Sequence, residues 1–154
     1  MNLSSFIDSS SIRANLSARN KRQLLQTLGQ VASQQLGLDP GLVTDAIVER
    51  EKLGSTGFGG GVAIPHGKVS GLDHVYGLVA RLDQPVDYQA IDKMPVDLVF
   101  LLLSPPDAGA EHLRALAAVS RLIRHGDALD QIRGARSKDA MASVLLGADE
   151  LHAA

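Results

Sequence analysis

Only one polar residue interrupts the run Val96-Asp97-Leu98-Val99-Phe100-Leu101-Leu102-Leu103. A short apolar run of this kind is typical of a strand that is covered on both of its faces. We therefore expect these residues to form the central strand of a β-sheet that carries helices on both sides.

Two segments upstream of this run also have the character of strands. Residues 75–82 are mainly apolar, and Val62-Ala63-Ile64 is a short strand that ends at Pro65. Proline has no N–H to donate to a neighbouring strand, so it is a natural end point. Turn residues at 84–85 and 93–95 separate the two longer strands and leave room for a short edge strand at 86–88.

Two helices are predicted before the strands. Ser17 is a candidate N-cap for a helix whose apolar residues follow a 3.6-residue period up to Gly37. Asp39-Pro40 then supplies an N-cap and a first helical residue for a second helix, which ends at Gly54. The apolar residues of this second helix, Leu42 and Leu53 among them, are expected to face inward.

Two more helices are predicted after the strands. One covers about residues 111–126, with Leu113 in its apolar stripe, and the last begins after Ser137 and ends at Gly147. This order of elements favours an α/β fold: a single-domain α/β sandwich with a mixed parallel and antiparallel sheet, covered by helices on both faces. We expect residues 1–154 to form one domain, with its core at about residues 5–147.

Composition narrows the classes of function. The chain has 154 residues, of which 45% are hydrophobic and 21% charged, as in an ordinary globular domain. Its net charge of -2 offers no basic surface for nucleic acid. There are no cysteines, and no segment approaches the ~18 apolar residues of a membrane span. These features predict a cytoplasmic protein that is not inserted in a membrane.

Glycine is concentrated in the segment that leads from the second helix to the first strand, Gly54-Ser-Thr-Gly-Phe-Gly-Gly-Gly-Val-Ala-Ile-Pro-His-Gly-Lys68. A Walker A loop would need a preceding strand, a following helix, and Ser or Thr directly after Gly-Lys. Here a helix precedes and a strand follows, and the dinucleotide fingerprint fails for the same reason. A nucleotide-dependent enzyme is therefore a weak alternative.

The same segment places a histidine at the end of a strand, between Pro65 and Gly67. A histidine that accepts a phosphoryl group needs one neutral ring nitrogen exposed, the other held by an acceptor, and room for the donor. His66 meets the first and last of these needs. From residue types alone, a partly exposed histidine in a tight glycine loop is an equally good interpretation.

The glycine segment resembles the active-site signature of the fructose/mannitol family of phosphotransferase-system enzyme IIA. The similar residues are Gly54 to Gly59 and Ala63-Ile64-Pro65-His66-Gly67-Lys68. Arg50-Glu51, residues 95–98 and the helix that contains His112-Leu113 also fall where this family has similar segments. The resemblance covers most of the chain, from the first helix to beyond Ser137.

The resemblance implies roles for three residues. His66 would accept the phosphoryl group as a tele-phosphohistidine, although the residues themselves do not distinguish the two ring nitrogens. His112 would be the second active-site histidine, in the first turn of a helix whose dipole favours a neutral ring, and Arg50 would stabilise phosphate charge. Without the resemblance, Arg50 would be a surface ion-pair partner and His112 a residue without special role.

A partner protein would have to approach His66 closely. The residues expected to allow this are Gly57, Phe58, Gly59, Gly60, Gly61 and Gly67. Phe58 could be an exposed apolar anchor, but a core position is the favoured interpretation for it. His74, His125 and His152 are assigned no role, and neither a metal nor a bound cofactor is expected, since the phosphoryl group would arrive covalently.

The segment from Arg50 to Gly57 looks closest to the nitrogen-regulatory branch of the family, and the absence of an attached sugar-specific or membrane domain points the same way. The implied donor is the carrier HPr or its nitrogen-branch counterpart, and the implied recipients are regulatory targets or a IIB domain. Two alternatives stay open. One is a free-standing transport IIA, and the other is a binding module that uses unphosphorylated His66 only as a contact residue.

Overall fold

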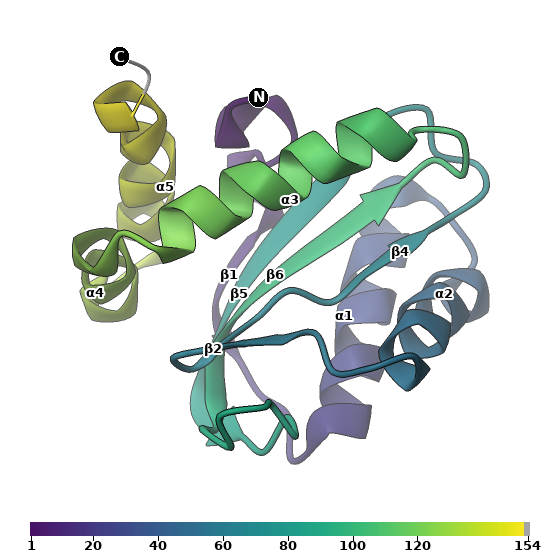
Figure 1. The fold of residues 1–154 in the computed structure, drawn as a ribbon, viewed down its shortest axis with the longest axis horizontal. Helices are drawn as coiled ribbons and strands as arrows, with labels where there is room; N and C mark the ends of the chain where they lie inside the picture. Colours follow the sequence, from purple (N-terminus) through teal and green to yellow (C-terminus); the bar gives the residue numbers. More distant parts are fainter. Residues whose placement is uncertain (153–154) are drawn as a thin grey trace.

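The run at residues 96–104 does form the centre of the sheet. The computed structural model describes residues 1–152, and the side chains of residues 1–147. Strand β6 (Val96–Ser104) pairs antiparallel with β5 (Tyr76–Val86) and parallel with β3 (Val62–Ala63) and β4 (His66–Lys68). With β1 (Ile12–Leu16) beside β5 and β2 (Gly57–Gly59) beside β3, the strand order is β1-β5-β6-β3-β2 (Figure 1). The sheet is mixed, as predicted.

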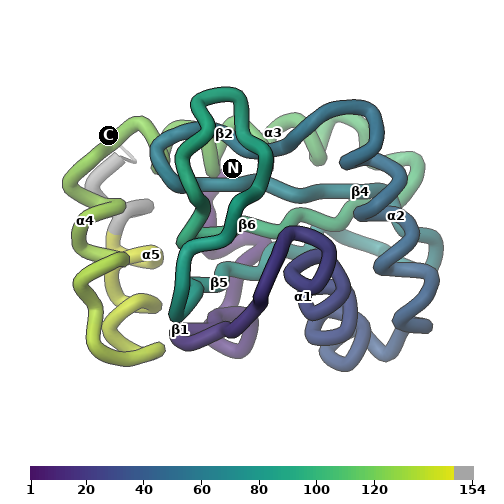
Figure 2. Tube along the Cα trace, turned by 90° about the horizontal axis from the view of Figure 1, so that it is seen from below, coloured from purple at the N-terminus to yellow at the C-terminus, as the bar shows by residue number. Residues whose placement is uncertain are grey.

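Helices cover both faces of this sheet. Helices α1 (Lys21–Leu36) and α2 (Pro40–Lys52) share one hydrophobic cluster with it, whereas α3 (Gly109–Ile123), α4 (Gly126–Gly134) and α5 (Lys138–His152) contribute to a second. Two short 3-10 helices, η1 (Leu3–Ser5) and η2 (Ser9–Ser11), precede β1. Figure 2 shows α4 and α5 at one end of the molecule and α1 and α2 towards the other. The predicted fold class is confirmed.

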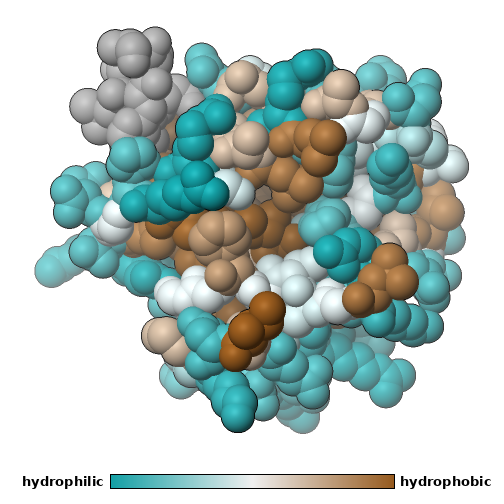
Figure 3. All heavy atoms as spheres, in the orientation of Figure 1, coloured by the Kyte–Doolittle hydropathy of each residue, from teal (hydrophilic) through white to brown (hydrophobic). Residues whose placement is uncertain are grey.

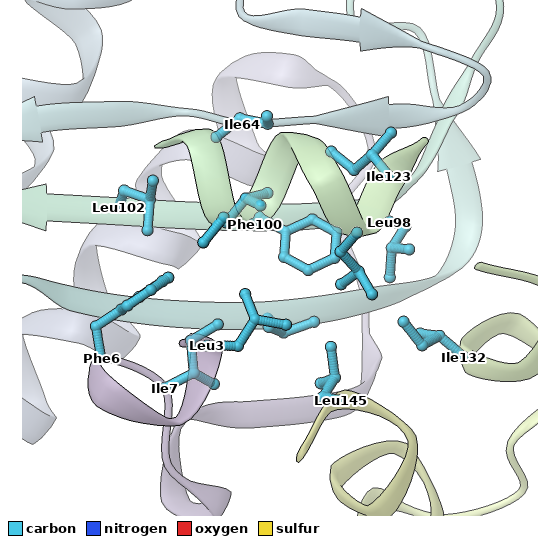
Figure 4. Packing of buried hydrophobic residues seen from close by; sticks show 14 of the residues in the cluster. Leu3, Phe6, Ile7, Ile64, Leu98, Phe100, Leu102, Ile123, Ile132 and Leu145 are labelled. Carbon is cyan, nitrogen blue, oxygen red and sulfur yellow. The ribbon is translucent and has the colours of Figure 1, made fainter. Parts of the chain in front are cut away.

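The side chains of β6 explain the two-sided core. Because successive side chains of a strand point to opposite faces, Leu98, Phe100 and Leu102 join the cluster of α3 to α5 (Figure 4), and Val99, Leu101 and Leu103 join that of α1 and α2. All six are at most 1% exposed. Each side chain buried in this way contributes about 1.5–3 kcal/mol relative to an exposed one. None of the helices within residues 1–152 is both long and apolar enough to span a membrane.

The helix boundaries agree with the predicted ones only in part. The side chain of Asp39 caps α2 as predicted, but α1 is capped by Asn20 and not by Ser17, whose hydroxyl instead donates to Asp83. The prediction that Leu42 and Leu53 face inward is wrong, since they are 43% and 84% exposed. Leu53 lies one residue beyond the end of α2, so the helical period no longer applies to it.

Several elements were not expected from the sequence. β1 is an edge strand with mixed polar residues, β5 continues through Pro85 to Val86 in place of a separate edge strand, and α4 is short. The guanidinium of Arg81 donates to the carbonyls of Ile132, Arg133 and Ala135 at the end of α4, a long-range contact that local sequence does not reveal.

The last helix starts where it was expected but ends later. Ser137 accepts a hydrogen bond from the Ala140 N–H, as a capping residue does. The helix then continues through Gly147 to His152, whose side chain lies outside the described residues.

Candidate functional site

His66 begins a strand of its own. β3 ends at Ala63, and after Ile64 and Pro65 the chain resumes pairing with β6, now with His66 opposite Leu102. The Leu102 N–H donates to the Pro65 carbonyl at 3.0 Å, so the chain stays against β6 across the interruption. The expectation that His66 lies at the end of a strand is corrected, because the proline only divides one parallel segment into two.

The two ring nitrogens of His66 have different partners. Nδ1 lies 2.8 Å from the carbonyl oxygen of Ile64, and Nε2 lies 3.2 Å from Nε of Arg50. A carbonyl can only accept a hydrogen bond and a guanidinium can only donate one. Nδ1 therefore carries the proton, and Nε2 presents its lone pair. This is the tautomer of a ring that is nucleophilic at Nε2.

Arg50 lies in the last turn of α2 and links that helix to the glycine segment. Besides its contact with His66, it donates through Nη1 to the Gly54 carbonyl at 3.1 Å. The guanidinium is therefore held beside Nε2 by its contacts with both His66 and Gly54. Its planar fork suits phosphate oxygens, which it can bind through two nitrogens at once.

His112 lies beside His66, as the fourth residue of α3. The centroids of the two rings are 5.3 Å apart, with an angle of 49° between the planes. The Nδ1 atom of His112 is hydrogen-bonded to the Ser104 hydroxyl, and the residue is 8% exposed. The structure thus brings Arg50, His66 and His112 together from α2, β4 and α3.

Both histidines are held in the neutral form. Burial lowers the pKa of His66 below its usual 6.5, and the charge of Arg50 adds to this, whereas the Ile64 hydrogen bond and Glu51 oppose it. Burial likewise lowers the pKa of His112, followed by the effects of His66 and Lys68. A neutral imidazole has the lone pair that nucleophilic attack requires.

The glycine hairpin between β2 and β3 is fixed by two side chains. The Gly60 N–H donates to Asp92 at 2.9 Å, and the Gly60 carbonyl accepts from Arg133 of α4 at 2.8 Å. Arg133 also pairs with Asp97 of β6, at 2.9 Å. Gly60 and Gly61 have φ angles of +66° and +83°, which glycine adopts readily. The hairpin is therefore held in one conformation against the body of the protein.

The six residues expected to receive a partner divide into two groups. Gly57, Phe58, Gly59 and Gly60 are partly or fully exposed, and Phe58 is 44% exposed, so the core interpretation of Phe58 is wrong. Gly61 and Gly67 are buried. A Cβ atom on Gly61 would lie 2.8 Å from Arg133, and one on Gly67 would lie 3.0 Å from the Ala46 carbonyl of α2. These two glycines permit close packing inside the protein and do not form part of an open surface.

Two exposed leucines accompany the site and were not expected there. Leu53 follows the helix that carries Arg50, and Leu113, placed inward by the sequence, is 66% exposed. Successive residues of a helix point in directions 100° apart. Because His112 faces the interior, the next residue, Leu113, faces away from it. Figure 3 shows separate brown patches beside a pale band at the level of β2. Exposed apolar side chains therefore lie on the segments that carry Arg50 and His112.

Other features of the molecule lie away from the histidines. A groove of about 730 Å³ between the start of α1 and α2 is lined by charged residues and contains neither His66 nor His112. Within the described residues, no three His, Asp or Glu side chains are grouped as a metal site would require.

The low pKa of His66 can be measured by NMR titration of its ring nitrogens. We expect the pKa to lie below 6.5 and to rise in an Arg50→Gln variant, because burial remains but the neighbouring positive charge is lost. The contribution of the neutral His66 ring to the stability of the folded protein is complete above pH 6.5, and it is lost as the pH falls through the lowered pKa. Glu49→Gln, an exposed change on the same helix, is the control. A pKa of His66 that fell in the Arg50→Gln protein would contradict this assignment.

Comparison with known proteins gives a consistent result. The family model for "Phosphoenolpyruvate-dependent sugar phosphotransferase system, EIIA 2" matches residues 5–147. A nitrogen regulatory protein of Bradyrhizobium diazoefficiens is 48% identical over 130 residues, which cover 84% of this chain and 85% of that protein. A nitrogen regulatory protein of Escherichia coli K12 is 35% identical over 146 residues, covering 94% and 90%.

Solved structures agree with the sequence relatives. The crystal structure of nitrogen regulatory protein IIA-Ntr from Neisseria meningitidis superposes with a TM-score of 0.86 at 31% identity, covering 92% of this chain and 97% of that one. IIA mannitol from Escherichia coli has the same fold, with a TM-score of 0.76 at 18% identity, covering 90% and 98%. The chain therefore belongs to the EIIA type 2 family of the phosphoenolpyruvate-dependent sugar phosphotransferase system.

Proposed function

We propose that this protein is a cytoplasmic phosphocarrier that accepts a phosphoryl group on Nε2 of His66 from an HPr-type carrier and acts as a nitrogen-regulatory IIA. The observation that carries the proposal is the fixed tautomer of His66. Its Nδ1 proton is held by the Ile64 carbonyl, and its Nε2 lone pair faces the Arg50 guanidinium. The nucleophilic atom and a group for phosphate charge are therefore already side by side.

In the proposed reaction, the Nε2 lone pair attacks the phosphorus of the carrier's phosphohistidine. The new N–P bond forms as the carrier's N–P bond breaks, and that electron pair returns to the carrier's ring nitrogen. Nδ1 keeps its proton throughout. Arg50 shifts its hydrogen bond from Nε2 to the phosphoryl oxygens, and the start of α3, which has no side-chain cap, provides further N–H groups and a positive dipole end.

The carrier would dock on the open surface around His66. Phe58, Leu53 and Leu113 are exposed apolar side chains on the segments that carry or adjoin the site residues. Together with the partly exposed Gly57 and Gly59 and the exposed Gly60, they offer contact area without bulky side chains around it. Such a surface suits a protein that must bind, react and leave, and its apolar side chains are candidate anchors.

The relatives support the regulatory branch, because the two most similar proteins described above are both named as nitrogen regulatory proteins. The transport alternative rests on relatives such as the fructose-specific EIIA component of Haloferax volcanii, which is 37% identical but over only 101 residues, 66% of this chain. In the regulatory proposal, target proteins read the phosphorylation state of His66. In the transport alternative, the phosphoryl group passes to a IIB domain.

A reconstituted relay tests the proposal. The protein is incubated with phosphoenolpyruvate, enzyme I and either HPr or its nitrogen-branch counterpart, and intact mass and peptide mapping follow the product. We expect one acid-labile phosphoryl group per chain, on His66, with faster transfer from the nitrogen-branch carrier. An absence of adduct with both carriers would exclude phosphoryl transfer and leave the binding-module alternative. Faster transfer from HPr would favour the transport role.

A further inference from the structure

Glu51 is a buried carboxylate that the proposed reaction does not use. It follows Arg50 in α2, and its side chain is 6% exposed. Oε1 accepts from the Thr56 N–H at 2.9 Å and from Lys21 at 2.8 Å, while Oε2 accepts from the Thr56 hydroxyl at 2.6 Å and from the Tyr88 hydroxyl at 3.3 Å. Oε1 thus has two donors. Oε2 has the Thr56 hydroxyl and a share of the Tyr88 hydroxyl proton, which also lies 2.9 Å from the Thr56 hydroxyl oxygen.

The hydrogen bonds continue from Thr56 to the reactive ring. The Thr56 carbonyl accepts from the Ile64 N–H at 2.9 Å, and the Ile64 carbonyl lies 2.8 Å from Nδ1 of His66. A continuous path therefore joins the Glu51 carboxylate to the nitrogen whose proton sets the tautomer. Arg50 and Glu51 follow each other in α2. Arg50 contacts Nε2 of the His66 ring directly, and Glu51 is connected to Nδ1 through Thr56 and Ile64.

The far end of this path is anchored in two other parts of the fold. The Lys21 ammonium, at the start of α1, lies 4.4 Å from the centroid of the Tyr88 ring, and Tyr88 is fully buried. Burial raises the pKa of Tyr88, so its hydroxyl keeps the proton that it donates. Burial opposes the ionisation of Glu51, but Lys21 and Thr56 outweigh it and hold its pKa below 4.5. The carboxylate is therefore charged and fully paired at neutral pH.

We propose that Glu51 is a positioning residue for phosphoryl acceptance: it fixes Thr56, and through Thr56 the Ile64 carbonyl that holds the proton on Nδ1 of His66. The inference rests on the proposed function of His66. Three of the four contacts of the Glu51 carboxylate are with Thr56 or Tyr88, and the Tyr88 hydroxyl itself contacts the Thr56 hydroxyl at 2.9 Å. The carboxylate is therefore tied mainly to Thr56, whereas a residue that only stabilised the fold could have partners in any part of the chain.

The test compares three variants in the relay assay. Glu51→Ala is expected to lower the transfer rate about 10–100-fold, the usual loss when the partner behind a functional side chain is removed. Glu51→Gln should restore much of the rate, because its oxygen can accept from Thr56 and Lys21 while its amide donates to the hydroxyls. Glu49→Ala removes an exposed carboxylate from the same helix, which pairs with Lys52 at 3.0 Å, and should leave the rate unchanged.

A second readout separates positioning from stability. NMR of the His66 ring should show the Nδ1–H tautomer in the wild type and in Glu51→Gln, and a rise of the Nε2–H tautomer in folded Glu51→Ala. If the alanine variant does not fold, Thr56→Val carries the test, with a smaller loss of rate and the same change of tautomer. Normal rates, or a lower rate with an unchanged His66 tautomer in folded protein, would overturn the proposal.

The same experiments keep the two proposals apart. A wild-type protein that forms no adduct refutes the proposed function, and the tautomer measurement still reports whether Glu51 orients His66. A wild-type protein that forms the adduct, with a folded Glu51→Ala protein that forms it equally fast, refutes only the role of Glu51.

Discussion

The His66→Ala protein is expected to accept no phosphoryl group in the relay assay. The substitution removes the nucleophilic nitrogen, and the other ring at the site cannot replace it, because His112 is 8% exposed and its Nδ1 is bound to Ser104. Intact mass under alkaline conditions, which preserve phosphohistidine, measures the adduct directly. The fold should persist, since His66 is only partly buried and alanine keeps the backbone pairing with Leu102.

The matched variant is His112→Ala. It removes the neighbouring ring, 5.3 Å away, but leaves the Ile64 and Arg50 contacts of His66 in place. We expect slower transfer but a detectable adduct on His66. The opposite pattern, in which the adduct survives His66→Ala and disappears with His112→Ala, would move the acceptor to His112.

Arg50→Ala is expected to lower the rate of transfer to His66 by about 10²–10³-fold, the loss typical of removing one donor from developing negative charge. Arg50 lies 3.2 Å from the nitrogen at which the phosphoryl group would arrive, so it needs little movement to reach the oxygens. Rapid-quench measurement of adduct formation under excess donor gives the rate of the chemical step.

Arg50→Lys distinguishes charge from geometry. Lysine keeps a positive charge but cannot bind Gly54 and a phosphoryl oxygen with one planar group. We expect it to recover only a small part of the rate. Thermal unfolding of both variants checks that a lower rate is not caused by unfolding of the protein. A folded Arg50→Ala protein with the wild-type rate would exclude Arg50 from the proposed mechanism.

Much of the fold could be predicted from local sequence. The apolar run at 96–103 predicted a central strand, and it lies between β5 and β3 with both faces buried. The elements that were missed depend on distant contacts. β1 is a strand because β5 offers it a parallel neighbour, and α4 ends where Arg81, more than 50 residues earlier, reaches its last carbonyls. Local periodicity carries no information on either contact.

The candidate site was predicted less completely. The resemblance identified Arg50, His66 and His112, and the structure places them together. The tautomer of His66 depends on the Ile64 carbonyl two residues earlier, and no residue type indicates that contact. Glu51 was noted only as part of a motif, because its partners Lys21, Thr56 and Tyr88 converge only in the folded chain.

The contact between Arg50 and Nε2 of His66 gives the unmodified protein a cation directly beside the proposed acceptor nitrogen. Because Nδ1 keeps its proton, transfer of a phosphoryl group to Nε2 would add one net negative charge to the neutral ring and so offset the positive charge of Arg50. The positive electrostatic potential at this point would then be lost without any movement of the backbone. A target protein with an acidic contact surface would favour the unmodified state, and a target with a basic one would favour the phosphorylated state. The same surface would thus bind different partners according to the charge at His66.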